Sequence, residues 1–276
     1  MSLESSLERT GIGREPARTE AAFDPRELVR RWAAIVVFAL LWELVPRSGL
    51  IDATFVPPCS EVLVRLTSGL FSGELVTHLL VSLSRSLAGF SLALGVAIPL
   101  GFALGWFRSF ERFFDPLIQL FRQTPALALL PLFIPMLGVG EISKIAIIFY
   151  GAQWAIQLNT VSGVKNVDPL LIKLARSLGL GRLDLFRKII FPAALPTIFT
   201  GLRLSATRSI LIIVAAEMMG AKEGLGYVLK NSEYSYDVVT MYAAILLLAL
   251  IGLSTNYLLV ALERHLTGYK PEVTRY

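Results

Sequence analysis

The chain has 276 residues, of which 54% are hydrophobic and 17% are charged, and its formal net charge is +5. A soluble domain carries about 25% charged residues, and a soluble helical bundle needs amphipathic helices rather than segments that are apolar on every face. The composition therefore disfavours a soluble protein. A single cysteine excludes an internal disulfide, and two histidines leave little for a metal site, so we expect none.

A polar N-terminal tail (1–30) comes first, followed by a long apolar region (31–265) and a short C-terminal tail (266–276). The mean hydropathy is +0.63. Each apolar run must satisfy its own backbone hydrogen bonds as a helix if it crosses a bilayer. We predict an all-α integral membrane protein with about six transmembrane helices, placed near 31–46, 78–106, 114–136, 143–164, 195–219 and 238–262. No small-residue cleavage site follows the first run, so we interpret it as a retained span rather than a signal peptide.

The second and third predicted spans carry residues that bend helices or let them pack closely. Gly101 and Gly105 give the second span a small-residue face. Kinks or breaks are predicted by five prolines: Pro99, Pro116, Pro125, Pro131 and Pro135. Such bends are tolerated where helices line a cavity. Gln123 and Pro125 are therefore candidates for a translocation path.

Several charged residues fall well inside predicted spans, among them Arg85, Arg122, Arg203, Arg208 and Glu217. A charge at the bilayer centre costs about 2.5–3.5 kcal/mol on insertion scales, so each is expected to pair, to reach an interface or to line a path. We expect Arg85 and Glu217 to form a structural ion pair, although Glu217 also counts among the path candidates. Arg208 lies nearest mid-membrane and either offers a bidentate fork to an oxyanion such as a sulfonate or pairs with an acid or with helix carbonyls.

Lysine and arginine outside the spans gather in segments that share one side of the membrane. With the N-terminus in the cytoplasm, the opposite side holds only Arg47, Arg65, Lys144, Lys222 and Lys230. Because cytoplasmic loops carry the excess of positive charge, both termini are expected inside. This orientation explains the basic net charge, so we expect no nucleic-acid partner. The segment 220–237 then lies outside, as an aromatic belt or as a contact for a solute-binding protein.

The polar stretch between the fourth and fifth spans, residues 168–192, differs from an ordinary loop. Asp168 before Pro169 is a typical helix start. An apolar stripe at helical spacing follows it, made of Leu170, Leu171, Leu174 and Leu178. Gly179 and Gly181 end this helix, and a second amphipathic piece begins near Leu183. The stripe needs either a protein partner or the lipid headgroups to cover it. We call residues 168–192 the coupling segment.

The coupling segment resembles the cytoplasmic EAA motif of importer permeases of the ATP-binding-cassette (ABC) class. That motif has E-A-A, a glycine after three residues, and I-x-L-P after nine more. Here it reads Lys173-Leu174-Ala175, then Gly179, then Ile189-Ile190-Phe191-Pro192, with departures at Lys173, Leu174 and Phe191.

Further similar stretches extend the resemblance over residues 53–265. They include Phe55–Pro58, Pro125–Leu132, Gly138–Lys144 and Gly224–Tyr227. The chain thus resembles type I permeases of the branch that imports sulfonates, taurine, nitrate or bicarbonate.

The resemblance implies a division of labour between subunits. The chain would be a homodimeric permease in a bacterial cytoplasmic (inner) membrane, with two copies of an ABC ATPase and a periplasmic or lipid-anchored solute-binding protein. The residues that it implies for contact with the ATPase are Ala175, Leu178, Gly179, Leu180, Arg182, Phe186, Ile189 and Pro192. ATP and magnesium would bind the partner ATPase, and this chain would bind no cofactor. The sequence has no G-x-x-x-x-G-K-[ST] phosphate loop of its own.

A small anion such as an aliphatic sulfonate or taurine is our first expectation, and nitrate, bicarbonate or another small organic solute is the alternative. An ATP-independent secondary transporter is a further alternative. The sequence contains neither H-E-x-x-H nor G-x-S-x-G, so we do not expect an intramembrane enzyme.

Overall fold

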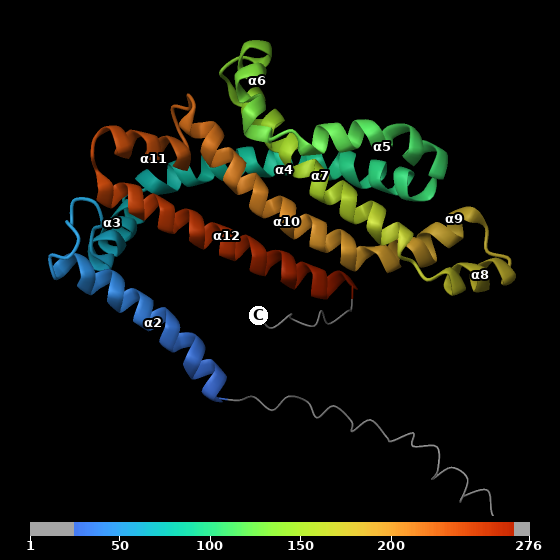
Figure 1. Cartoon of the computed structure of the whole chain (residues 1–276), viewed down its shortest axis with the longest axis horizontal. Helices are drawn as coiled ribbons and strands as arrows, with labels where there is room; N and C mark the ends of the chain where they lie inside the picture. The colour runs from blue at the N-terminus through green and yellow to red at the C-terminus, as the bar shows by residue number, and fades with distance from the viewer. Residues whose placement is uncertain (1–24, 268–276) are drawn as a thin grey trace, which may run out of the picture. The chain divides into compact units, whose positions relative to one another are not determined.

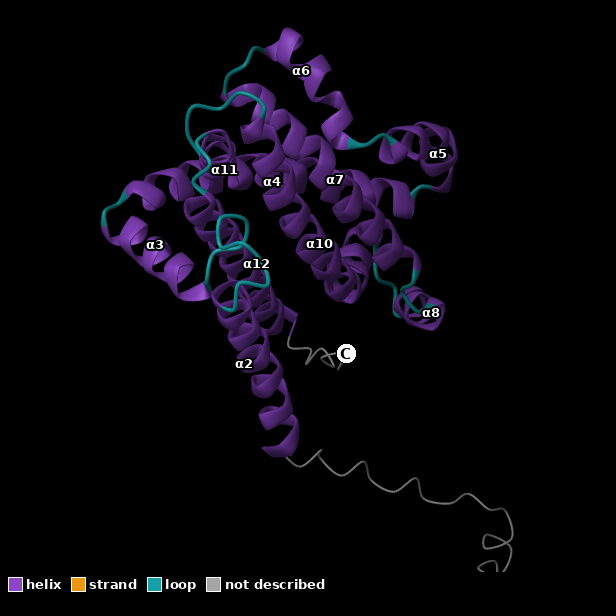
Figure 2. Cartoon of the chain, turned by 60° about the vertical axis from the view of Figure 1, so that its left-hand side comes forward, coloured by secondary structure: helices purple, strands orange, loops and turns teal. Residues whose placement is uncertain are grey.

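Every regular element that the computed structural model describes, in residues 25–267, is a helix, and loops join the helices without any strand (Figure 2). The chain divides into two units, Met1–Cys59 and Ser60–Tyr276. The expected tails lie almost wholly outside the described residues. The all-helical prediction is confirmed.

The first unit contains α2 (Pro25–Arg47), which begins before the predicted start of the first span. The indole Nε1 of Trp42 donates to the carbonyl of Pro57 at 3.1 Å, which ties the following loop back to the helix. Within that loop, Thr54 donates its backbone N–H to Asp52 at 2.9 Å. Hydrogen bonding from Thr54 lowers the pKa of Asp52.

The second unit is a bundle of long helices (Figure 1). Its main members are α4 (Glu74–Trp106), α7 (Glu141–Lys165), α10 (Phe191–Met218) and α12 (Val238–Thr267). In this bundle α7 packs along both α4 and α10. The end at which α4 and α7 finish and α10 begins is called the coupling end below, because the coupling segment lies there.

Glycines let α4 and α7 approach closely. A Cβ on Gly101 would stand 2.6 Å from the Cβ of Thr160, and one on Gly89 would stand 2.6 Å from the Cβ of Ile148. Gly105 faces Val164 in the same way. The predicted small-residue face is confirmed, and it extends along α4 as far as Gly89.

In the part of the chain that the structure describes, three continuous helical stretches are long and apolar enough to cross a membrane: Glu74–Trp106, Arg182–Met218 and Val238–Leu266. A bent pair in the third predicted span would make a fourth. The helix α7 is also long, at 25 residues, but buries polar side chains such as Gln157 and Thr160. Because neighbouring helices cover α7, it does not need the uniformly apolar surface of a lipid-facing helix. The count of six spans stays a prediction.

The third predicted span is broken, as its prolines predict. It consists of α5 (Arg108–Gln123), the 3-10 turn η2 (Ala126–Leu129) and α6 (Leu130–Leu137). The two halves meet at 87°. Alongside α7, the helix α5 extends from an ion pair of Glu111 with Lys165 to a hydrogen bond from Tyr150 to the carbonyl of Phe121 at 2.6 Å. It therefore approaches the break from the coupling end (Figure 1).

Two shorter helices, which the sequence analysis did not predict, lie at the opposite end of the bundle: α3 (Cys59–Phe71) and α11 (Leu225–Tyr234). Arg65 of α3 donates to Thr240 of α12 at 2.8 Å. With 13 and 10 residues, these helices are too short to span a membrane, so a search for long apolar runs does not find them.

Candidate functional site

The coupling segment begins with α8 (Pro169–Ser177), whose two ends follow the sequence prediction. Asp168 accepts a hydrogen bond from the backbone N–H of Leu170 at 2.7 Å and so caps the helix. At the other end Gly179 adopts φ +76°, and the N–H of Leu180 donates to the carbonyl of Ala175 at 3.1 Å. This is the glycine-dependent helix stop in which the chain reverses.

After the glycine turn the chain enters a helix that does not stop before α10. A single turn, α9 (Arg182–Leu185), continues through a π-helical turn, η3 (Phe186–Ile190), into α10. The second amphipathic piece is thus the first part of a 37-residue helix, Arg182–Met218. Pro192 has no N–H to donate, and a π turn immediately before it lets the helix pass a proline.

One side of the coupling segment is part of the bundle core. Ala175, Leu185 and Ile190 are buried in the same apolar cluster as Phe102 of α4 and Ala194 of α10. This packing fixes the turn against three helices of the bundle. The coupling segment is therefore packed against the bundle and continuous in its second part with α10.

The other side of the coupling segment presents leucines to the surroundings. Leu174, Leu178 and Leu183 are 55%, 70% and 68% exposed. Among the predicted contact residues, Gly179, Arg182 and Pro192 are exposed as well. Leu180, Phe186 and Ile189 are half-buried, and Ala175 lies behind the surface in the core.

An apolar hollow of about 440 Å³ separates α9 from the end of α4. Phe102, Trp106 and Phe107 line it on one side, and Leu183 and Phe186 on the other. The rings of Phe102 and Phe186 meet edge to face at 5.0 Å. The turn at Phe186 therefore packs against an aromatic side chain of α4.

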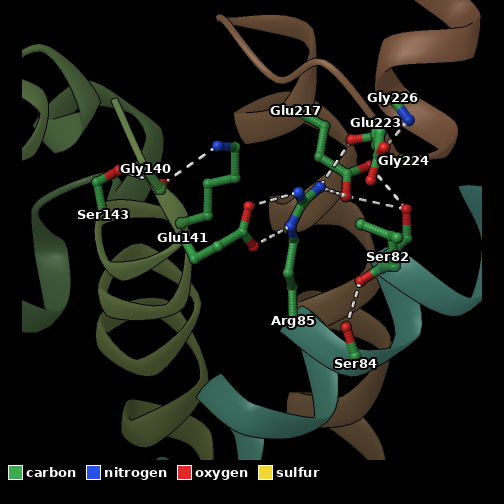
Figure 3. A network of polar contacts seen from close by, with 12 residues as sticks. Ser82, Ser84, Arg85, Gly140, Glu141, Ser143, Glu217, Glu223, Gly224 and Gly226 are labelled. Carbon is green, nitrogen blue, oxygen red and sulfur yellow. Dashed lines mark hydrogen bonds and ion pairs between the residues drawn. The ribbon is translucent and has the colours of Figure 1, made fainter. Parts of the chain in front are cut away.

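A buried ionic cluster lies at the opposite end of the bundle (Figure 3). Arg85 of α4 donates to Glu217 of α10 at 2.8 Å, and its other side pairs with both oxygens of Glu141 at the start of α7. The Glu217 side chain is fully buried, whereas that of Glu141 is 58% exposed. The predicted Arg85–Glu217 pair is confirmed. The sequence analysis missed Glu141, because the glutamate stands at a predicted loop.

Glu217 makes several hydrogen bonds beyond its ion pair. It accepts from the Ser82 hydroxyl at 2.8 Å and from the backbone N–H of Gly226 at 3.0 Å. The guanidinium of Arg85 also donates to the carbonyl of Glu223 at 2.7 Å. We name Ser82, Arg85, Glu141 and Glu217 the Arg85 cluster. It ties the ends of α4, α7 and α10 to the start of α11, and it leaves no buried carboxylate uncompensated there.

The predicted outer segment, residues 220–237, contains the whole of α11 and the turns on either side of it. Tyr234 and Tyr236 are 73% and 86% exposed. The ammonium of Lys230 donates to Glu233 at 3.0 Å and stands 4.5 Å from the ring centroid of Tyr234. The hydrogen bond with Glu233 raises the pKa of Lys230. This surface is therefore aromatic and charged, as its sequence suggests.

The four path candidates lie in different surroundings. Gln123 and Pro125 are exposed at the break between α5 and η2, and Arg208 is exposed on α10. Glu217, in contrast, is fully buried in the Arg85 cluster. The remaining span arginine on α10, Arg203, lies 3.4 Å from Glu263 near the end of α12.

Comparison with known proteins identifies the class. Residues 93–268 match the family model described as "Binding-protein-dependent transport system inner membrane component". The chain belongs to this family of ABC transporter permeases. It is therefore a membrane subunit and not an enzyme, in a multi-pass inner-membrane family that works with an ATPase and a solute-binding protein.

Relatives cover nearly the whole permease. A probable ABC transporter permease of Brucella abortus is 36% identical over 83% of this chain and 90% of its own length. The putative aliphatic sulfonates permease SsuC of Bacillus subtilis is 34% identical, over 85% of each chain. The taurine permease TauC of Escherichia coli is 33% identical over 90% of this chain and 92% of its own, and the nitrate import permease NrtB of a Synechocystis strain is 32% identical over 86% and 88%.

The fold has solved counterparts as well. An inward-facing structure of the methionine ABC transporter MetNI matches with a TM-score of 0.61 at 20% identity. The match covers 67% of this chain and 92% of that chain. The bundle therefore has the ABC importer permease fold.

Proposed function

We propose that this permease is the translocating subunit of an ATP-driven importer for a small anionic solute, such as an aliphatic sulfonate or taurine. It acts as a homodimer with two ATPase subunits, which bind the ATP and magnesium, and it receives solute from a periplasmic or lipid-anchored binding protein. The chain itself binds no cofactor. The sulfonate and taurine permeases among its relatives support this choice of solute. Nitrate, bicarbonate or another small organic solute is the alternative.

The observation that carries the proposal is the two-sided coupling segment. Its inner side is packed into the bundle core, and its outer side exposes Leu174, Leu178 and Leu183. An exposed apolar patch on a rigid support is typical of a protein interface. When the ATPase subunits close, force applied to this surface reaches α10 through continuous helix. An ATP-independent transporter has no need of such a surface.

The distribution of lysine and arginine supports one orientation of the permease in the membrane. Arg108, Lys165, Arg176, Arg187 and Arg264 all belong to helix ends or turns at the coupling end. Since positive charge is concentrated on the cytoplasmic side of membrane proteins, we place the coupling end and both chain termini in the cytoplasm. The Arg85 cluster and α11 then face the side from which a binding protein delivers solute.

The test is Leu178→Glu, assayed by co-purification of the permease with its cognate ATPase and by ATP hydrolysis of the complex. A carboxylate in the centre of an apolar interface loses its hydration without gaining a partner, so we expect association to fall at least about tenfold. Val139→Glu is the matched control. Val139 is 58% exposed and lies in the loop before α7, at the opposite end of the bundle.

The two variants separate interface loss from misfolding. Leu178 is 70% exposed, so the acid should leave the melting temperature of the isolated permease close to that of the wild type. If Leu178→Glu still binds the ATPase and couples hydrolysis to transport as well as Val139→Glu does, the coupling segment is not the docking surface. If wild-type permease drives uptake without any ATPase, the whole proposal is wrong.

A further inference from the structure

The span arginines fall into two classes in the structure. Arg85 and Arg203 each have a carboxylate partner, Glu217 and Glu263 respectively. For Arg122 and Arg208, no carboxylate among residues 33–266 forms an ion pair. A charge inside a membrane protein is expensive unless a counter-charge or water compensates it. The positive charges of Arg122 and Arg208 must therefore be compensated by water or by a bound anion rather than by a carboxylate of the described chain.

Both unpaired arginines lie near one three-way contact in the middle of the bundle. At Gly151 of α7, an added Cβ would meet Ile212 of α10 and, at 3.2 Å, Ala126 of the break. Arg208 precedes Ile212 by one helical turn on the same face of α10. Arg122 precedes Ala126 by four residues, at the end of α5. The contact thus brings together the neighbourhoods of two arginines that are far apart in sequence.

Both arginines also lie on the same side of that contact. Since α10 begins at the coupling end, Arg208 lies about 6 Å from Ile212 toward that end. Arg122 lies on the same side, because α5 approaches the break from the coupling end. Trp154 of α7 is three residues, about 4.5 Å, beyond Gly151 in the same direction. Arg122, Trp154 and Arg208 therefore lie on three helices around this contact, each three or four residues from a residue that takes part in it.

Several groups near this contact are hydrogen-bond donors without an acceptor in the described part of the chain. They are the Nε of Arg122, the Nε1 of Trp154 and the Nε2 of Gln157, one turn further along α7. Gln157 is only 1% exposed. A donor left unpaired away from water costs free energy. Two cations without a carboxylate partner, Arg122 and Arg208, and two neutral donors on α7, Trp154 and Gln157, favour a ligand that accepts hydrogen bonds and carries negative charge.

We infer that Arg122, Trp154 and Arg208 form a mid-bundle oxyanion site at the break of α5, which holds the anionic head of the solute during passage. The inference rests on the proposed function and specifies which residues recognise the anion. The guanidinium groups supply charge and paired N–H donors, which suit the planar or tetrahedral oxygens of a sulfonate. The indole of Trp154 supplies a neutral donor and reports on occupancy by its fluorescence. We call this set the break site.

The test uses the purified permease–ATPase complex without the binding protein, titrated with sodium ethanesulfonate at constant ionic strength. The neutral amide ethanesulfonamide, which has nearly the same shape, is the control ligand. We expect a saturable change in tryptophan emission with ethanesulfonate and none with the amide. In Trp154→Phe the change should vanish. Arg122→Gln and Arg208→Gln should each weaken apparent affinity at least about tenfold, since each removes a charge-assisted hydrogen bond.

Arg203→Gln is the matched control, since Arg203 is on the same helix but is already paired with Glu263. It should leave the titration unchanged. Should a glutamine variant fail to fold, Arg122→Lys and Arg208→Lys keep the charge but lose the fork, and a weaker, still anion-selective response is expected. Equal responses to the sulfonate and the amide, no saturable response in the wild type, or equal loss in Arg203→Gln would overturn the break site.

The same preparation tests the proposed function separately, through ATP hydrolysis, uptake and association with the ATPase. A complex that hydrolyses ATP and couples to uptake but lacks anion-selective binding disproves only the break site. A chain that does not associate with the ATPase at all disproves the function.

Discussion

The Arg85 cluster offers the sharpest quantitative prediction, for the variant Glu217→Gln. The glutamate carboxylate accepts from Ser82, Arg85 and the N–H of Gly226, and it is fully buried. The amide keeps the shape but removes the negative charge and turns one acceptor into a donor that faces donors. Removing one partner of a buried ion pair typically costs about 3–5 kcal/mol.

The matched control is Glu141→Gln, on the same guanidinium. The Glu141 side chain is 58% exposed, so water compensates for the lost carboxylate, and the expected cost is about 0–1 kcal/mol. Each variant replaces one carboxylate that pairs with Arg85 by a neutral amide. They differ in burial and in the hydrogen bonds that Glu217 alone accepts from Ser82 and Gly226, so the comparison measures the cost of removing a buried, fully bonded carboxylate against that of removing an exposed one.

Thermal unfolding of the detergent-solubilised permease, followed by tryptophan fluorescence, measures both effects. At about 2–4 °C per kcal/mol for a chain of this size, Glu217→Gln should lower the melting temperature by roughly 10 °C, and Glu141→Gln by no more than a few degrees. A double variant, Arg85→Met with Glu217→Leu, removes both buried charges and should recover much of the loss. A drop for Glu217→Gln no larger than that for Glu141→Gln would refute the reasoning.

Two further predictions concern packing and topology. Gly101→Ala should lower the free energy of unfolding by about 1–3 kcal/mol, because the added methyl group would collide with α7. Gly95→Ala is the control: the space around its Cβ is open, so the change should be neutral or slightly stabilising. Equal melting temperatures of the two variants would contradict the close approach of α4 and α7. The second prediction uses a Cys59→Ser background and a membrane-impermeant thiol reagent. Ser177→Cys should react only in inverted vesicles, and Ser235→Cys should react only in intact cells with a permeable outer layer. Labelling of both cysteines from one side would reject the proposed orientation.

Much of the architecture was predictable from local sequence. The apolar runs located the long helices, because each span must close its own hydrogen bonds. Pro125 and its neighbours predicted the break, and Asp168 and Gly179 predicted both ends of α8, because these residues act on backbone geometry within a few positions. The Arg85–Glu217 pair followed from the cost of leaving either charge alone in a membrane.

Tertiary structure decided what depends on which helix faces meet. The pairing of Glu141 with Arg85 joins α7 to α4, and no local pattern indicates it. The fusion of the coupling segment with α10 depends on burial of Leu185 and Ile190 in the shared core, which the amphipathic pattern alone left open.

The break site illustrates the same limit. Its residues come from three helices, which meet at Gly151, where a missing side chain lets α10 and the break approach α7. The sequence by itself determined a helical membrane permease and named Arg208 as an unusual charge. Only packing brought the helices of Arg122, Trp154 and Arg208 together, because helix register is set by side-chain interlocking between segments distant in the chain.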